Sequence, residues 1–203
     1  MNRQKHWDTA YNSKSPDEVS WYQPLPEKSL ELIQATGVRA NEPILDVGGG
    51  ASKLVDELLN EGFENVSVLD VSPIALQHAR ERLGVRAERV RWIELDILSF
   101  DAPHAYAIWH DRAVFHFLTS TDERDRYIDI MHTSLQPGGH FALATFGPEG
   151  PTRCSNLDVQ RYSIAALETL LLGRFKLRSH EIDVHSTPSG SEQQFIYSWW
   201  QKT

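Results

Sequence analysis

The sequence has one cysteine, fewer basic than acidic residues and no long apolar run. The single cysteine, Cys154, excludes an internal disulfide bond. The 28 Asp and Glu residues outnumber the 20 Lys and Arg residues, which disfavours broad binding to a phosphate backbone. We therefore expect no nucleic acid partner.

No apolar run approaches the roughly 18 residues needed to span a bilayer, and the start Met1–His6 has no apolar signal core. We expect a cytoplasmic protein without membrane contact. The histidines and Cys154 lack the paired spacing of a CxxC or HExxH motif, so we expect no metal site. At 203 residues and 40% hydrophobic, the chain suits one domain, residues 1–203, with a full core.

The residues that are present centre on one stretch. The apolar run Ile44–Val47 leads into Gly48, Gly49 and Gly50 and then into an amphipathic segment, which predicts a strand, a tight turn and a helix. Glycines at such a turn allow positive φ and let a ligand lie against the main chain, so we expect a nucleotide-like ligand. The dinucleotide pattern G-x-G-x-x-G/A fails at its third place, where Lys53 stands, which counts against NAD and FAD.

Two acidic residues narrow the choice of ligand. Asp70 closes the next apolar run, where a carboxylate can accept both hydroxyls of a ribose. Asp46 lies two residues before Gly48, where it can help hold an ammonium group. An amino-acid-bearing nucleoside has an ammonium group, whereas a dinucleotide has none.

At this point the sequence resembles the class I S-adenosylmethionine (SAM) dependent methyltransferases, whose first motif is D-x-G-x-G. The resemblance runs from about Trp7 to the C-terminal end. It implies an α/β, Rossmann-like fold with a mostly parallel seven-stranded sheet that ends in an antiparallel hairpin. It also implies an enzyme that transfers a methyl group, with SAM as cofactor and S-adenosylhomocysteine (SAH) as product.

The resemblance assigns three further residues to the cofactor. In this family the acidic residue that ends the third strand, here Asp96, accepts a hydrogen bond from the adenine amino group. Ile97 then packs on the adenine ring, and Val71 faces its other side. The alternative for Asp96 is a plain N-cap at the end of a strand.

The first forty residues are polar but contain several aromatic side chains. The stretches His6–Asp8 and Ser20–Gln23 resemble the N-terminal segment of a group of bacterial class I methyltransferases, where it lies over the cofactor. We expect residues 1–40 to form a helical cover, with Trp21 at the cofactor and the segment Trp7–Pro26 mobile until the cofactor binds. The alternative is that the aromatics only seal the sheet.

From residue 43 onward the pattern alternates as in a parallel α/β sheet. We expect strands at 44–47, 66–69, 90–95, 106–109 and 141–146, and a terminal hairpin formed by 175–184 and 194–200. We expect helices after Pro26, at 53–61, 73–83 and 122–135, and around 164–171. The segment Gly147–Gln160 is predicted to be irregular, and the turn Leu135–Gly139 to lead into the fifth strand.

The fourth strand runs into His110, Asp111 and Arg112, followed by His116, where the family places residues on the acceptor side. A similar Asp-Arg pair occurs in thiopurine and other thiol methyltransferases, and an acidic residue here appears in lysine methyltransferases of elongation factors. His110, Asp111 and His116 are our candidate catalytic residues. One of them would deprotonate an ammonium or hydroxyl acceptor, whereas a thiolate needs no base. The alternative for the histidines is a hydrogen-bonded structural role.

The methyl acceptor stays open. The aromatic cover favours a small molecule in an enclosed pocket, whereas the net charge of −8 would attract a lysine-bearing protein. A SAM-binding module without activity is a third alternative, and the sequence does not predict the oligomeric state.

Two other features have structural interpretations. The basic run from Arg80 to Arg91 is interleaved with glutamates, which predicts a solvated helix face. Cys154 is predicted to be a passive loop residue, although Arg153 beside it would favour a redox-active thiolate.

Overall fold

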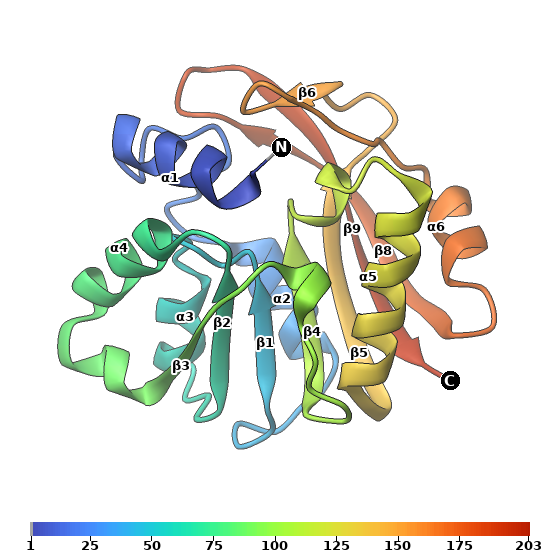
Figure 1. Cartoon of the computed structure of the whole chain (residues 1–203). Coiled ribbons are helices and arrows are strands. Elements are labelled where there is room, and N and C mark those ends of the chain that lie inside the picture. Colours follow the sequence, from blue (N-terminus) through green and yellow to red (C-terminus); the bar gives the residue numbers. More distant parts are fainter. Residues whose placement is uncertain (1) are drawn as a thin grey trace.

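A seven-stranded sheet with the order β3-β2-β1-β4-β5-β9-β8 runs through the computed structural model, which describes residues 2–203 (Figure 1). Its strands are β1 (Ile44–Val47), β2 (Val66–Asp70), β3 (Val90–Glu94), β4 (Tyr106–Arg112), β5 (Leu135–Phe146), β8 (Phe175–Ser186) and β9 (Glu192–Lys202). The α-helices are α1 (Arg3–Ser13), α2 (Glu27–Ala35), α3 (Leu54–Asn60), α4 (Pro73–Leu83), α5 (Thr121–Ser134) and α6 (Ile164–Leu171). Short 3-10 turns are η1 (Gly84–Arg89), η2 (Ile97–Ser99) and η3 (Phe115–Phe117).

The predicted fold class is confirmed. Strands β3, β2, β1, β4 and β5 pair in parallel, whereas β9 pairs antiparallel with both β5 and β8. The terminal hairpin is therefore part of the main sheet, and β9 lies inside it. This order brings β9 next to β5 at the carboxyl end of the parallel strands.

Apolar side chains bury both faces of the sheet. All four residues of β1 are buried, as expected for a central parallel strand. One core lies between the sheet and α2, α3 and α4, and another between the sheet and α5 and α6. Ser72 caps α4 by accepting from the Ala75 amide, with Pro73 in the first turn.

Two strand boundaries differ from the prediction. β4 continues through His110 and Asp111 to Arg112, so the candidate catalytic residues begin on a strand. β5 starts at Leu135, which already pairs with Tyr106. The predicted turn Leu135–Gly139 lies within β5 as an irregularity: Gly138 has a φ of +74°, and the pairing moves from Leu135 to His140 while β4 moves only from Tyr106 to Ile108.

The segment predicted to be irregular contains a short hairpin, β6 (Arg153–Cys154) and β7 (Leu157–Asp158). Asn156 and Ser155 form its turn with positive φ. Within residues 2–203, no helix combines the length and the apolar character needed to cross a membrane.

Candidate functional site

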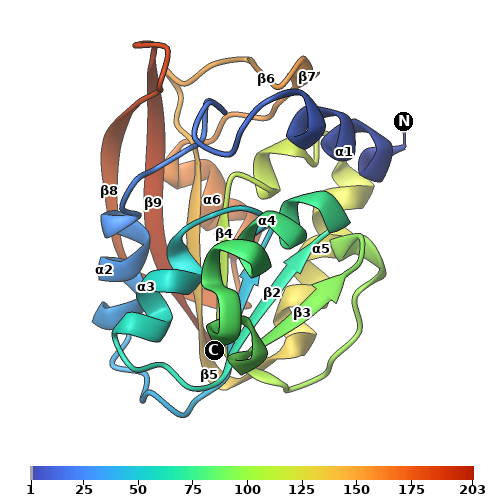
Figure 2. The same ribbon diagram turned by 90° about the vertical axis from the view of Figure 1, so that its left-hand side faces the viewer.

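A cavity of about 420 Å³ lies at the carboxyl ends of the parallel strands. Figures 1 and 2 show α1 across this end of the sheet, close to α4. Parallel α/β sheets bind ligands at this edge. The strand ends and the turns that follow them contribute Val47, Gly48, Leu69, Asp70, Val71, Leu95, Asp96 and Ile97 to the lining.

A second cavity of about 40 Å³ adjoins the first and shares Trp21 and Gly48 with it. Asp46 and Gly49 line this smaller cavity, whereas Gly50 lines neither cavity in the described part of the chain. The other predicted cofactor residues line the large cavity, namely Trp21, Asp70, Val71, Asp96 and Ile97.

The glycine turn leaves no room for side chains. Gly48 has a φ of +66°, and a Cβ on it would lie 2.0 Å from Cγ2 of Val114. Gly50 has a φ of +39°, and a Cβ on it would lie 2.7 Å from a carboxylate oxygen of Asp70. Both positions therefore require glycine for backbone conformation and for space.

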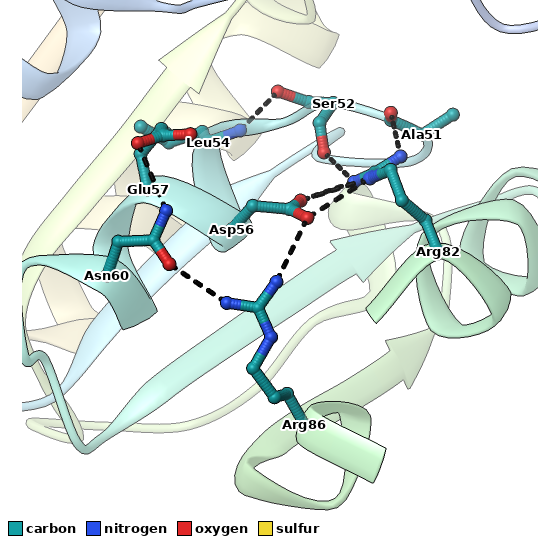
Figure 3. Close-up of polar contacts among 8 residues, drawn as sticks. All are labelled: Ala51, Ser52, Leu54, Asp56, Glu57, Asn60, Arg82 and Arg86. Atoms are coloured by element: carbon teal, nitrogen blue, oxygen red, sulfur yellow. Dashed lines mark hydrogen bonds and ion pairs between the residues drawn. The ribbon is translucent and has the colours of Figure 1, made fainter. Parts of the chain in front are cut away.

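Arg82 of α4 holds the end of this turn (Figure 3). Its guanidinium donates to the carbonyl oxygens of Ala51 at 2.8 Å and Ser52 at 2.6 Å, and it pairs with Asp56 at 2.7 Å. Arg86 approaches the same carboxylate at 3.8 Å. For Arg82 the prediction of a solvated face was wrong, because the largely buried Asp56 draws its guanidinium onto α3. The Arg86 side chain stays 42% exposed, as the prediction has it.

Asp70 ends β2 with a desolvated carboxylate. The Ser72 amide donates to its Oδ1 at 2.8 Å. Burial raises the pKa of Asp70 to about 7, and the nearby charges of Asp46 and Asp8 act in the same direction. A carboxylate in this state gains from any ligand that brings hydroxyl donors.

Asp96 follows β3 and has two structural contacts besides lining the cavity. Its Oδ1 accepts from the Leu98 amide at 3.0 Å, so the predicted N-cap alternative describes it as well. Its Oδ2 accepts from the Arg3 guanidinium at 3.1 Å, and Arg3 also pairs with Glu123. One end of α1 is thereby tied to the mouth of the cavity.

The N-terminal segment covers the cavity as a helix and a following loop. Asp8 of α1 accepts from the Ser72 hydroxyl at 2.6 Å. The Trp21 indole donates to the Tyr11 hydroxyl at 3.2 Å, and Trp7 packs edge-on against Trp21. Trp7, Tyr11 and Trp21 all line the large cavity. Of the predicted cover, residues 1–40, α1 and the loop up to Gln23 contribute residues that line the cavities, whereas α2 packs on the sheet. Mobility of the segment Trp7–Pro26 without cofactor stays a prediction.

Two candidate catalytic residues are buried at the end of β4. His110 Nδ1 lies 2.7 Å from Asp46 Oδ1, so the histidine orients that carboxylate. Asp111 accepts from the amides of Val114 and Phe115 and from the Tyr127 hydroxyl, and burial raises the pKa of Asp111 to about 6. Asp111 thus supports the turn that packs against Gly48.

His116 is fully buried and its ring stacks on Phe146 with 4.2 Å between centroids. Neither ring nitrogen has a hydrogen-bond partner within residues 2–203, and burial lowers the pKa of His116 to about 3. Among the described residues that line the large cavity, none of His110, Asp111 and His116 is found. Their catalytic role stays a prediction.

The rest of the large cavity is lined mainly by side chains from residue 112 onward. Residues 112–117 belong to the stretch after the fourth strand that the sequence places on the acceptor side, although the lining residues of this stretch were not singled out as site residues. The sequence contains no local signal for the β5 and β9 positions, because only the sheet order brings them here. These linings are Arg112, Ala113, Val114, Phe117, Leu118, Thr119, Phe146, Cys154, Leu157, Asp158, Gln193 and Phe195.

Cys154 is buried on β6 and lines this part of the cavity, so the predicted passive loop position was only partly right. Burial raises the pKa of its thiol. A raised pKa disfavours the thiolate and counts against the redox alternative.

The described residues fit the cofactor that the sequence predicts. The glycine turn is a cradle that any Cβ would fill. Asp46 Oδ2 is buried and has no hydrogen-bond partner in the described chain, and Asp70 is desolvated. SAM carries a ribose whose hydroxyls suit Asp70 and an ammonium that suits Asp46.

Residues 44–139 match a family model described as a methyltransferase domain. The eEF1A lysine and N-terminal methyltransferase of Mus musculus is 21% identical over 145 residues, covering 67% of this chain and 20% of that protein. The malonyl-acyl-carrier-protein O-methyltransferase 1 of Ilyobacter polytropus is 26% identical over 137 residues, covering 66% of this chain and 49% of that protein. The chain thus spans between about a fifth and a half of these relatives.

Among solved structures, the Burkholderia thailandensis 1,6-didemethyltoxoflavin-N1-methyltransferase with bound 1,6-didemethyltoxoflavin and SAH has the same fold. Its TM-score is 0.70 at 19% identity, covering 98% of this chain and 84% of that chain. The chain thus has the fold of solved methyltransferases, and residues 44–139 are similar to a methyltransferase domain. Within residues 2–203, no cluster of metal-ligating side chains is found.

Proposed function

We propose that this protein transfers the methyl group of SAM to a small-molecule acceptor. The observation that supports this most is the aromatic lining of the acceptor half of the cavity. Phe117, Phe146 and Phe195 line it, and Leu157 of the β6–β7 hairpin adds apolar surface. Such walls exclude water and favour a compact, partly apolar ligand.

The strand ends are proposed to hold the cofactor. Asp70 accepts from the ribose hydroxyls, Asp96 from the adenine amino group, and Val71 and Ile97 enclose the ring. When bound, SAM supplies a methyl group activated by a positively charged sulfur. The protein's part is to position the acceptor in line with that methyl group, and positioning of this kind contributes up to about 7–11 kcal/mol in favourable cases.

A general base among His110, Asp111 and His116 stays a prediction. Their burial favours a positioning role, since His110 orients Asp46 and Asp111 supports the turn at Val114. Alanine variants distinguish the two roles. Loss of a base lowers turnover about 10²–10⁴-fold at constant SAH affinity. Loss of a support lowers the melting temperature and SAH affinity together.

A protein lysine is the second candidate acceptor. Carboxylates at the cavity, namely those of Asp96, Glu123 and Asp158, would attract a basic side chain. One observation counts against a protein acceptor. Helix α1 lies over the opening of the cavity, and Arg3 ties this helix to Asp96 and Glu123. A third candidate function is a binding module without activity, which would hold SAM without transferring its methyl group.

The test is transfer of label from methyl-labelled SAM to fractions of a cell extract, separated by mass. We expect label in the low-mass fraction with wild-type protein and none with Asp70→Ala. Label confined to proteins would contradict the small-molecule proposal. SAH binding by calorimetry without any transfer would favour the binding module.

A further inference from the structure

Arg112, the last residue of β4, has one donor group without a partner. Its Nε donates to the Tyr197 hydroxyl at 3.1 Å, and its Nη1 donates to the Trp21 carbonyl oxygen at 2.8 Å. Its Nη2 is buried and has no hydrogen-bond partner within residues 2–203. A buried donor on a charged group is costly to leave unpaired, so Nη2 indicates a ligand with an acceptor atom.

The Arg112 guanidinium stands beside the aromatic side chains of the acceptor half. It stacks on Phe195 with 5.0 Å to the ring centroid, and both residues line the large cavity. Phe146 lines the same cavity, with 4.7 Å between its ring centroid and that of Phe195. Aromatic rings pack well on planar molecules, and a guanidinium matches the geometry of a carboxylate-like group. This part of the cavity therefore suits a planar molecule that carries an anionic group.

Three other ionisable side chains from residue 112 onward line the large cavity, and each is paired or protonated. Asp158 pairs with Arg153 at 3.1 Å, and Glu123 pairs with Arg3. Burial raises the pKa of the Cys154 thiol, so this thiol is protonated at neutral pH. An acceptor that must lose a proton in the site needs a base, whereas an acceptor that is already ionised needs none. The lining thus favours an acceptor that arrives as an anion.

We propose that the methyl acceptor is a planar molecule with an acidic group ionised at neutral pH, and that Arg112 binds and selects this group. The inference rests on the proposed function, because it names the class of acceptor for the same site. In a carboxylate or a similar group, two atoms share the negative charge. One of them accepts a hydrogen bond from Arg112 Nη2, and the other receives the methyl group.

The transfer balances without a proton. The second atom of the acidic group uses a lone pair to form the bond to the methyl carbon. The bond from that carbon to sulfur breaks, and its electron pair stays on sulfur. The acidic group loses its negative charge and the sulfur loses its positive charge, so no base takes part.

The surroundings of Arg112 prepare it for this role. Its two hydrogen bonds, to Tyr197 and Trp21, fix the guanidinium in advance, so it loses less freedom when it binds an anion. Its positive charge also disfavours an ammonium acceptor, since like charges repel each other. Arg112 would therefore determine which charge the acceptor carries.

The first test measures binding with SAH at saturation. The probes are cinnamate and cinnamamide, which are both planar, have nearly the same shape and differ in charge. We expect calorimetry to show that wild-type protein prefers cinnamate. Arg112→Gln should weaken cinnamate binding about 10–100-fold, the scale of a hydrogen bond to a charged group, and change cinnamamide binding by less than about twofold. Arg112→Lys, which keeps the charge, should give a smaller loss and serves if the glutamine variant fails to fold.

Arg153→Gln is the matched control. It removes the same charge from β6, and Arg153 is absent from the described lining of the cavity. Melting temperatures check the folding of each variant. The proposal would be overturned by wild-type protein that does not prefer cinnamate, or by an unchanged cinnamate affinity in Arg112→Gln. An equal loss for both probes, or an equal loss in Arg153→Gln, would overturn it as well.

The second test separates a cell extract by anion exchange at neutral pH before adding methyl-labelled SAM and the protein. We expect the acceptor in the retained low-mass fraction. The labelled product should pass through the same column, because methylation removes the charge. A labelled product from the unretained fraction, or one that is still retained, would contradict the inference and leave the proposed function intact. Absence of label from every low-mass fraction would instead contradict the proposed function.

Discussion

The two halves of the large cavity are built from different material. The half beside β1, β2 and β3 consists of strand ends and main chain, with the glycine turn, Asp70 and Asp96 fixed by the fold. The other half consists mainly of side chains from the end of β4, η3, β5, the β6–β7 hairpin and β9. Side chains can change without altering the sheet. The fold therefore identifies the half that suits SAM, and the acceptor depends on a few side chains.

The largest expected effect comes from closing the glycine turn. Gly48→Ala adds a methyl group where Val114 leaves no space, and it places a side chain on a residue with positive φ, which strains the backbone. We expect the free energy of unfolding to fall by about 2–5 kcal/mol, and SAH binding to be lost. Gly62→Ala is the control, since φ there is +86° and no described atom lies within 4 Å of the added Cβ. Equal losses in both variants would mean that space at Gly48 is unimportant.

The next effect concerns Asp70 and pH. Because its pKa in the free protein is about 7, Asp70 is largely protonated below that pH, whereas ribose hydroxyls favour the carboxylate. SAH affinity should be full above about pH 7 and fall as the pH decreases, and Asp70→Asn should weaken SAH by about 1–3 kcal/mol. Calorimetry across pH 5–8.5 measures both.

The Asp70 carboxyl group affects folding stability in the opposite direction from SAH affinity as the pH rises. The unfolded chain loses the Asp70 proton near pH 3.8, before the folded protein does, so the group lowers stability as the pH rises to about 7. Asp70→Asn should therefore be more stable than wild type at pH 8 without ligand. An SAH affinity that does not depend on pH in wild type would contradict the raised pKa.

A variant of Arg82 tests whether the half of the cavity beside β1, β2 and β3 depends on support from α4. Arg82→Ala removes the donors to Ala51 and Ser52 and leaves the buried Asp56 short of a cation. We expect a stability loss of about 1–3 kcal/mol and weaker SAH binding. Thermal unfolding and calorimetry measure these, with Arg89→Ala, an exposed arginine of the same basic run, as control. Similar results for both variants would restore the solvated-face interpretation.

The smallest effect is expected in the acceptor half. Gln193→Ala removes a polar group that lines the cavity on β9 and leaves the strand ends untouched. With an identified acceptor, we expect kcat/KM to fall about three- to tenfold at unchanged SAH affinity. Gln194→Ala is the control, because its side chain bonds Glu149 instead. A change in SAH affinity for Gln193→Ala would break the separation of the two halves.

The sequence predicts the half beside β1, β2 and β3 well, because its acidic residues stand at or just after the ends of apolar strands. Asp46 and Asp70 could be located from local patterns, and Asp96 from the family resemblance. Phe146, Gln193 and Phe195 could not, since the insertion of β9 between β5 and β8 is a property of the whole sheet. Arg82 shows the same limit, because a run of charges does not show which arginine meets Asp56.

The ties of α1 have a kinetic consequence. Arg3 and Asp8, five residues apart on the helix, hold it to Asp96 after β3 and to Ser72 after β2. A product that leaves past this helix waits for these bonds to open. Release would then limit steady-state turnover, and the first catalytic cycle would run faster than the following ones. Added salt weakens a partly exposed ion pair such as that of Arg3 and Asp96, so it would shorten the delay between cycles.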